Sequence, residues 1–134
     1  MRFFNLDKFV EVNARPYVDD ILSLSITVAA EGFTGNGGCE IWRSDLGKFN
    51  QDLKRLEATR SGEIILKTIH PDSFRFGLTV INRRRDILIH GQITSLGAEI
   101  YGDFHNALQF AFELDLEHFW QSVQSFDEMV SNIK

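Results

Sequence analysis

The stretch FRFGLTVINRRRDILIHGQI, residues 74–93, decides the fold class, because every second residue in each half is apolar or glycine. This is the period of a β-strand with one buried face. The polar segment 82–85 between the halves has the length of a hairpin loop. Pairing Val80 with Ile87 puts both apolar sets on one face, and a slip of one residue would expose them all. The stretch therefore predicts an antiparallel hairpin of firm register.

The same alternation recurs on both sides of this hairpin. It predicts strands over residues 22–30, 63–69, 73–81, 86–96 and 107–114. Residues 97–101 either prolong the strand before them or form a short extra one. The first twenty residues carry weaker signals and predict an edge strand or an irregular segment, with a break at Arg15 and Pro16.

Two segments have the period of a helix instead. The first begins at Ser44 or Asp45 and ends at residues 60–62, with an apolar stripe made by Leu46, Phe49, Leu53 and Leu56. The second is expected to begin at Asp115 as its N-cap, with Leu114 packed on Phe119. Its expected buried face is Leu116, Phe119, Trp120, Val123, Phe126 and Val130.

This order of elements predicts an α+β fold in a single domain, residues 1–134. We expect an antiparallel sheet of about five to seven strands, with one mid-chain and one C-terminal helix packed on it. Twelve of the sixteen aromatic residues are phenylalanine. Seven of these lie in phase with predicted strands or helix stripes, which assigns them to packing.

Cys39 is the only cysteine, so an intramolecular disulfide and a multi-thiolate metal site are excluded. We expect it to be a small buried side chain. The glycine-rich run Gly35–Gly38 before it fits either a hairpin turn or a kinked strand that allows close backbone approach. It lacks the Lys-Ser/Thr pair of a phosphate loop.

The N-terminus lacks the pattern of a signal peptide, and the longest apolar stretch, residues 21–30, is too short to span a bilayer, so a cytoplasmic location is expected.

The net charge of −5 disfavours nonspecific binding to nucleic acid through the field of the whole protein, and no membrane partner is expected. The charge is also uneven along the chain. Residues 1–42 carry a balance of −3, residues 43–85 a balance of +5, and residues 86–134 a balance of −7. Such asymmetry fits an acidic face made for a basic partner, although folding can also bring the positive middle beside the negative end.

Three sets of residues are candidates for function. A basic protein would bind an acidic set, Glu113, Glu117, Asp127 and Glu128. An acidic protein would bind the hairpin arginines, Arg83, Arg84 and Arg85. A metal- or histidine-dependent enzyme would use His90, Asp103 and His105. No catalytic motif and no cofactor motif is present, so the first two sets are preferred and no cofactor is predicted.

Several local patterns carry a family resemblance. Residues 42–49 place Trp42 and the pair Asp45-Leu46 ahead of the helical Phe/Leu series, and Gly62 precedes a strand. Phe110-Ala111-Phe112 then runs into Asp115. Over about residues 40–130 the chain resembles the WapI-type immunity proteins, small bacterial proteins of polymorphic toxin systems. It departs from them by Asp115-Leu116 where they often have an Asp-Gln pair.

The resemblance implies a non-catalytic binding protein that neutralises a cognate toxin by occluding it, and it transfers no catalytic residue. The expected partner is therefore a protein. Two alternatives remain: a small enzyme of unknown reaction, and a structural or oligomerisation module that forms a homodimer.

Overall fold

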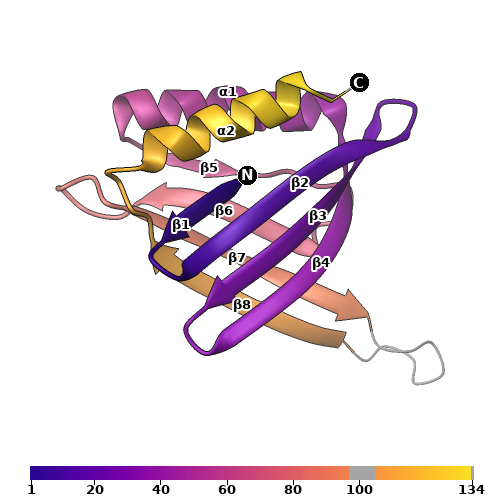
Figure 1. Cartoon of the computed structure of the whole chain (residues 1–134), viewed down its shortest axis with the longest axis horizontal. Helices are drawn as coiled ribbons and strands as arrows, with labels where there is room; N and C mark the ends of the chain where they lie inside the picture. Colours follow the sequence, from indigo (N-terminus) through magenta and orange to yellow (C-terminus); the bar gives the residue numbers. More distant parts are fainter. Residues whose placement is uncertain (97–104, 134) are drawn as a thin grey trace.

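A computed structural model describes residues 1–96 and 105–133 of the chain (Figure 1). Eight strands form two four-stranded antiparallel sheets, each connected as a meander. The N-terminal sheet contains β1 (Arg2–Asn5), β2 (Lys8–Val18), β3 (Ile21–Ala30) and β4 (Phe33–Trp42). The C-terminal sheet contains β5 (Glu63–Ile65), β6 (Phe74–Val80), β7 (Ile87–Leu96) and β8 (His105–Glu113). Helix α1 (Arg43–Thr59) joins the sheets, and α2 (Phe119–Ser131) follows the second one.

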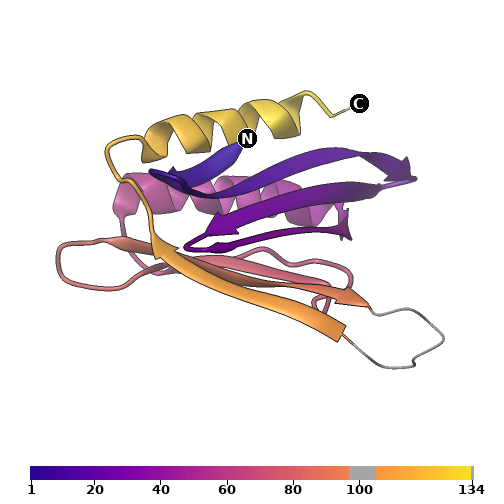
Figure 2. The same ribbon diagram turned by 60° about the horizontal axis from the view of Figure 1, so that its bottom comes forward.

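The two sheets face each other as layers, and both helices cover the same side of the pair (Figure 2). The sheets contact each other through β4 with β6 and β7, and through β3 with β8. Helix α1 packs on α2, β4 and β5, whereas α2 also packs on β1 and β2. The predicted α+β class with a mid-chain and a C-terminal helix is confirmed. Its strands are divided between two sheets, a division that the sequence pattern did not indicate.

The core lies between the layers and under the helices, and phenylalanine dominates it. Phe76 stands at its centre, with its ring centroid 5.5 Å from that of Phe3, 5.8 Å from that of Phe49 and 5.8 Å from that of Phe74. Each of these four side chains is no more than 2% exposed. Tilted and offset contacts at these distances are favourable for aromatic rings. The packing role predicted for Phe49, Phe74 and Phe76 is confirmed, whereas the buried position of Phe3 was not predicted.

The glycine-rich run is part of strand β4, with unbroken register against β3. Gly35 and Gly37 lie where the two sheets meet. A Cβ atom at Gly37 would lie 2.5 Å from Cγ2 of Ile93, and one at Gly35 would lie 2.8 Å from Cδ2 of Leu108. Of the two predicted roles, the strand that allows close approach is confirmed, because side chains here would push the sheets apart.

The hairpin that decides the fold class has the predicted register, with Val80 opposite Ile87. Helix α1 buries the predicted stripe and ends at Thr59. The next residue, Arg60, has a left-handed φ of 50°, and its N–H donates to Leu56 O. Cys39 is buried in β4, and burial raises the pKa of its thiol to about 12. This value suits the inert packing role expected for it.

The expected break at Arg15 and Pro16 is wrong, because β2 runs through both residues. Pro16 pairs with Leu22, and the register shifts only between Pro16 and Val18. A proline is tolerated here because β1 pairs with β2 only as far as Glu11, so the missing N–H faces no neighbouring strand.

The predicted start of the last helix is also wrong. Helix α2 begins at Phe119, four residues after Asp115. The N–H of Asp115 donates to Phe4 O at 3.1 Å, which draws the connection towards β1 before the helix begins. Residues 97–101, the expected extension of β7, lie outside the described residues. Within the described part of the chain, no helix is both long and apolar enough to cross a membrane.

Candidate functional site

The β1–β2 turn and the β8–α2 connection lie side by side at one end of the molecule (Figures 1 and 2). Asn5 Nδ2 donates to Glu113 O at 2.8 Å, and Asp115 N donates to Phe4 O. The rings of Phe4 and His118 stack with centroids 6.1 Å apart. We call this region the acidic end and define it by Leu6, Asp7, Glu113, Glu117 and Trp120.

Leu6 forms the tip of the β1–β2 turn. Asn5 pairs with Lys8, so Leu6 and Asp7 alone make the loop. Leu6 has a φ of 55°, in the left-handed region, and its side chain is 91% exposed. For a leucine this conformation costs about 1–2 kcal/mol, because Cβ approaches the following carbonyl. The turn therefore presents a large apolar side chain to solvent.

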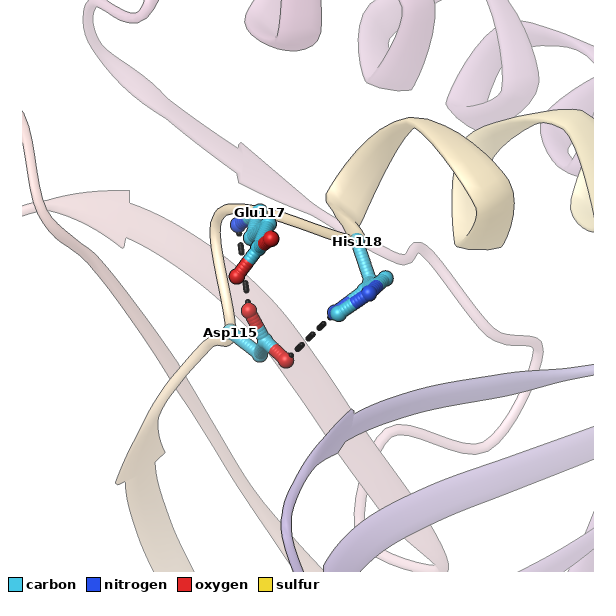
Figure 3. A group of neighbouring side chains, drawn as sticks. All are labelled: Asp115, Glu117 and His118. Atoms are coloured by element: carbon cyan, nitrogen blue, oxygen red, sulfur yellow. Dashed lines mark hydrogen bonds and ion pairs between the residues drawn. The ribbon is translucent and has the colours of Figure 1, made fainter.

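Asp115 holds the connection before α2 through hydrogen bonds with Glu117 and His118, as Figure 3 shows. Asp115 Oδ1 accepts a hydrogen bond from Glu117 N at 3.0 Å, and Asp115 Oδ2 lies 2.8 Å from His118 Nδ1. The hydrogen bond with His118 is the main cause that lowers the pKa of Asp115, and the same bond raises the pKa of His118. The side-chain atoms of Asp115, Glu117 and His118 that could bind a metal ion lie within 4.8 Å of one another. Both Asp115 oxygens already hold local groups, so the geometry is that of a capped turn.

The predicted acidic residues divide into two groups. Glu113 and Glu117 are exposed and belong to the acidic end. Asp127 instead accepts from Lys54 Nζ at 2.7 Å and from Asn50 Nδ2 at 2.9 Å, and these bonds tie α2 to α1. The bond from Lys54 is the main cause that lowers the pKa of Asp127. Glu128 is exposed in the C-terminal half of α2, away from Glu113 and Glu117.

The hairpin arginines differ from one another. Arg85 has a φ of 64°, and its Nη1 donates to Thr59 O at 3.2 Å, at the carbonyl end of α1. A cation is stabilised there by the helix dipole. Arg84 Nη2 lies 3.6 Å from Asp86 Oδ2. Only Arg83 lacks an ion pair or side-chain hydrogen bond to the part of the chain that the structure describes.

The predicted histidine site is not brought together by the strands. In the register of β7 and β8, His90 pairs with Ala111 whereas His105 pairs with Leu96. Along β7 these two positions differ by six residues in the sequence, which is about 20 Å along a strand. Asp103 and the side chain of His105 lie outside the described residues. His90 instead bonds Thr79 Oγ1, at 2.9 Å from its Nε2.

Sequence reasoning missed three residues of the acidic end. Leu6 and Asp7 carry no Asn-Gly or Asp-Gly turn signal, so their exposure at a tight turn was not predictable. Trp120 was expected on the buried face of the last helix, and this is wrong, since its side chain is 53% exposed. The buried stripe of α2 instead contains Phe119, Val123 and Phe126.

No family model matches the chain, and no curated protein matches it.

Proposed function

We propose that this chain is a non-catalytic protein-binding module that docks a basic partner protein on its acidic end. The observation that carries the proposal is the side chain of Leu6, 91% exposed on a strained turn among acidic residues. Within the fold this side chain buries almost no area that would offset the strain of its backbone. Insertion into an apolar pocket of a partner would offset it, since burying a leucine is worth about 1.5–3 kcal/mol.

The charges around Leu6 indicate the charge that the partner surface should carry. Asp7, Glu113 and Glu117 make no ion pair with the described residues, and the nearby Lys8 is held by Glu31 at 3.2 Å. A partner surface with a basic rim around an apolar pocket complements this arrangement. Exposed charges of one sign raise association rates more than they raise affinity, and salt screens them.

Trp120 adds a second apolar contact at the same end. Tryptophan is one of the residues most often found to dominate binding energy at protein interfaces. An exposed tryptophan near the start of α2 and an exposed leucine at the β1–β2 turn, together with the acidic residues of this end, have the composition of an interface with an apolar centre and a polar rim.

The immunity-type role is part of the same proposal. A module that covers a basic site on a toxin would neutralise it by occlusion, as the sequence resemblance implies. A homodimer through the acidic end is disfavoured, because a symmetric contact would bring like charges together. A different protein is therefore the preferred partner.

The test uses the full chain as bait in an extract of its source cells, followed by affinity measurements with the protein recovered. The double variant Glu113→Lys/Glu117→Lys reverses two charges of the acidic end. The matched control, Asp20→Lys/Glu40→Lys, makes the same change of net charge at the opposite end of the N-terminal sheet, where these residues use only backbone atoms in bonds across the fold. Leu6→Ala tests the apolar contact.

We expect the double variant to weaken binding about tenfold or more at low salt and to flatten its salt dependence. Leu6→Ala should weaken binding at every salt concentration. The control should bind as the parent chain does. Equal effects of the two double variants, or full binding by Leu6→Ala, would contradict the proposal.

A further inference from the structure

The outer face of the C-terminal sheet is hollowed at the middle of its strands. One hollow of about 330 Å³ lies between the β5 side and β7, and a more open one of about 460 Å³ adjoins it towards β8. Arg75, His90 and Gly91 line both. A volume of this order is that of a small-molecule site.

The backbone of a glycine, Gly91, forms part of the floor of the hollow. A Cβ atom at Gly91 would overlap the backbone oxygen of Arg75 and would lie 2.6 Å from Cζ of Phe110. This Cβ atom would face the inner side of the sheet, because Gly91 pairs with Phe76 and Phe110, whose side chains are buried. Gly91 therefore borders the outer hollow with its backbone alone. The walls are also apolar, with Ile65 and Pro71 on the β5 side.

Two cations border this apolar hollow. Leu66 N donates to Phe76 O at 2.9 Å, and Thr68 Oγ1 donates to Phe74 O at 3.2 Å. These two bonds place Lys67 beside Arg75 on neighbouring segments. Lys67 and Arg75 are both exposed, and neither makes an ion pair or a side-chain hydrogen bond with the described residues.

A histidine is held at the border between the two hollows. Thr79 Oγ1 lies 2.6 Å from Glu63 Oε2 and 2.9 Å from His90 Nε2. An ionised carboxylate only accepts, so the threonine hydroxyl donates to Glu63 and accepts from the Nε2–H of His90. This fixes the ring and its tautomer. His90 Nδ1 has no hydrogen-bond partner among the described residues and remains available to a ligand.

We propose that this hollow binds a small molecule with one carboxylate on a compact apolar body. The body lies on Gly91 against Ile65 and Pro71, where it displaces water from apolar surface. The carboxylate lies between Lys67 and Arg75, and a guanidinium matches a carboxylate with two parallel hydrogen bonds. His90 Nδ1 contacts a polar substituent of the body. This site is separate from the acidic end, and neither proposal depends on the other.

The test is a titration of the ¹⁵N-labelled full chain followed by amide chemical shifts. The probes are 3-phenylpropionate, its uncharged analogue 3-phenylpropionamide, phenyl phosphate, and a short peptide with a free C-terminal carboxylate. The variants are Arg75→Gln and Ile65→Ala, both at exposed side chains. The matched control, Arg15→Gln, removes one exposed cation from the outer face of the N-terminal sheet, and spectra without probe report that each variant is folded.

We expect 3-phenylpropionate to give saturable shifts centred on residues 65–68, 75 and 90–92. Arg75→Gln and loss of the probe's charge should each weaken binding about tenfold, and Ile65→Ala severalfold. Arg15→Gln should bind as the parent chain does. Linear shifts without saturation up to about 10 mM would overturn the proposal, since that concentration lies above any specific affinity of this kind. Tighter binding of phenyl phosphate or of the peptide, or an equal loss in Arg15→Gln, would also overturn it.

Discussion

The two sheets share strand number and connectivity, but their outer faces differ. On the N-terminal sheet, Arg2 lies 4.0 Å above the ring of Phe9 and bonds Glu11 at 2.9 Å. On the C-terminal sheet, Lys67 and Arg75 make no such bonds with the described residues, and they border a hollow. Arg2 on one outer face therefore helps to stabilise the fold, whereas Lys67 and Arg75 on the other are available to the proposed ligand.

The inner faces do not differ in this way. Both are lined by large apolar side chains, and the rings of Phe3 from one sheet and Phe76 from the other are in contact. Glycine permits close packing on this inner side in both sheets: Gly37 lets the sheets approach each other, and Gly91 leaves room for the ring of Phe110.

The largest effect is expected at the shared core. Phe76→Ala should lower the free energy of unfolding by about 3–5 kcal/mol, because it removes a ring packed on three others and leaves a cavity. Phe33→Ala is the matched control, since Phe33 is 66% exposed and its loss should cost no more than about 0.5 kcal/mol. Urea unfolding measures both. Similar losses in the two variants would contradict the placement of the core.

The next effect tests the contact between the sheets. Gly37→Ala should destabilise the protein by about 1–3 kcal/mol, because the β-branched Ile93 is stiff and cannot move its Cγ2 away. Gly35→Ala should cost less, since it meets the end of the flexible Leu108 side chain. Thermal unfolding of both variants shows which substitution destabilises the protein more. A larger loss in Gly35→Ala would show that the sheets meet differently.

A smaller effect compares the outer faces directly. Arg2→Ala should cost up to about 1 kcal/mol, because it removes a cation–π contact and an exposed ion pair. Arg75→Ala should leave the stability unchanged within about 0.5 kcal/mol. Chemical unfolding of the two variants measures both changes in the free energy of unfolding. If Arg75→Ala destabilised the protein as much as Arg2→Ala, its charge would be structural and the difference between the faces would disappear.

The smallest effect concerns pH at the capped turn. His118 has a raised pKa, so its bond to Asp115 stabilises the protein fully below the ordinary histidine value near 6.5 and is lost as pH rises through the folded value. Asp115 has a lowered pKa, so the stabilisation that its ionised carboxylate contributes is lost as pH falls through the folded pKa, which lies below 3.8. Histidine NMR titration should show a raised pKa for His118 that returns towards 6.5 in Asp115→Asn. An unchanged value in that variant would contradict the pairing.

Local periodicity was enough to predict the strands of the central hairpin, its register and α1. Each depends on contacts between residues that are close in sequence, such as Val80 with Ile87 or Leu53 with Leu56. The division into two sheets was not predictable, because it depends on which distant strands meet. Gly35 and Gly37 gave the one signal of this contact, as glycines on the apolar phase of a strand.

The candidate site was predicted only in part. Glu113 and Glu117 were recognised from charge alone, whereas the role of Asp127 depends on Lys54, which lies far away in sequence. Asp115 is a good N-cap residue, but its N–H is held by Phe4 and its carboxylate by His118, so tertiary bonds delay the helix. The hollow depends on neighbours across three strands, and no sequence pattern reports them.

Hydrogen–deuterium exchange of the full chain, alone and with the protein recovered from its source cells, tests the central claim most directly. The proposed function predicts that exchange slows at residues 5–8 and 113–120, the acidic end, on binding. Protection confined to the Arg83–Arg85 hairpin, or to the end of the N-terminal sheet around Asp20, would contradict it.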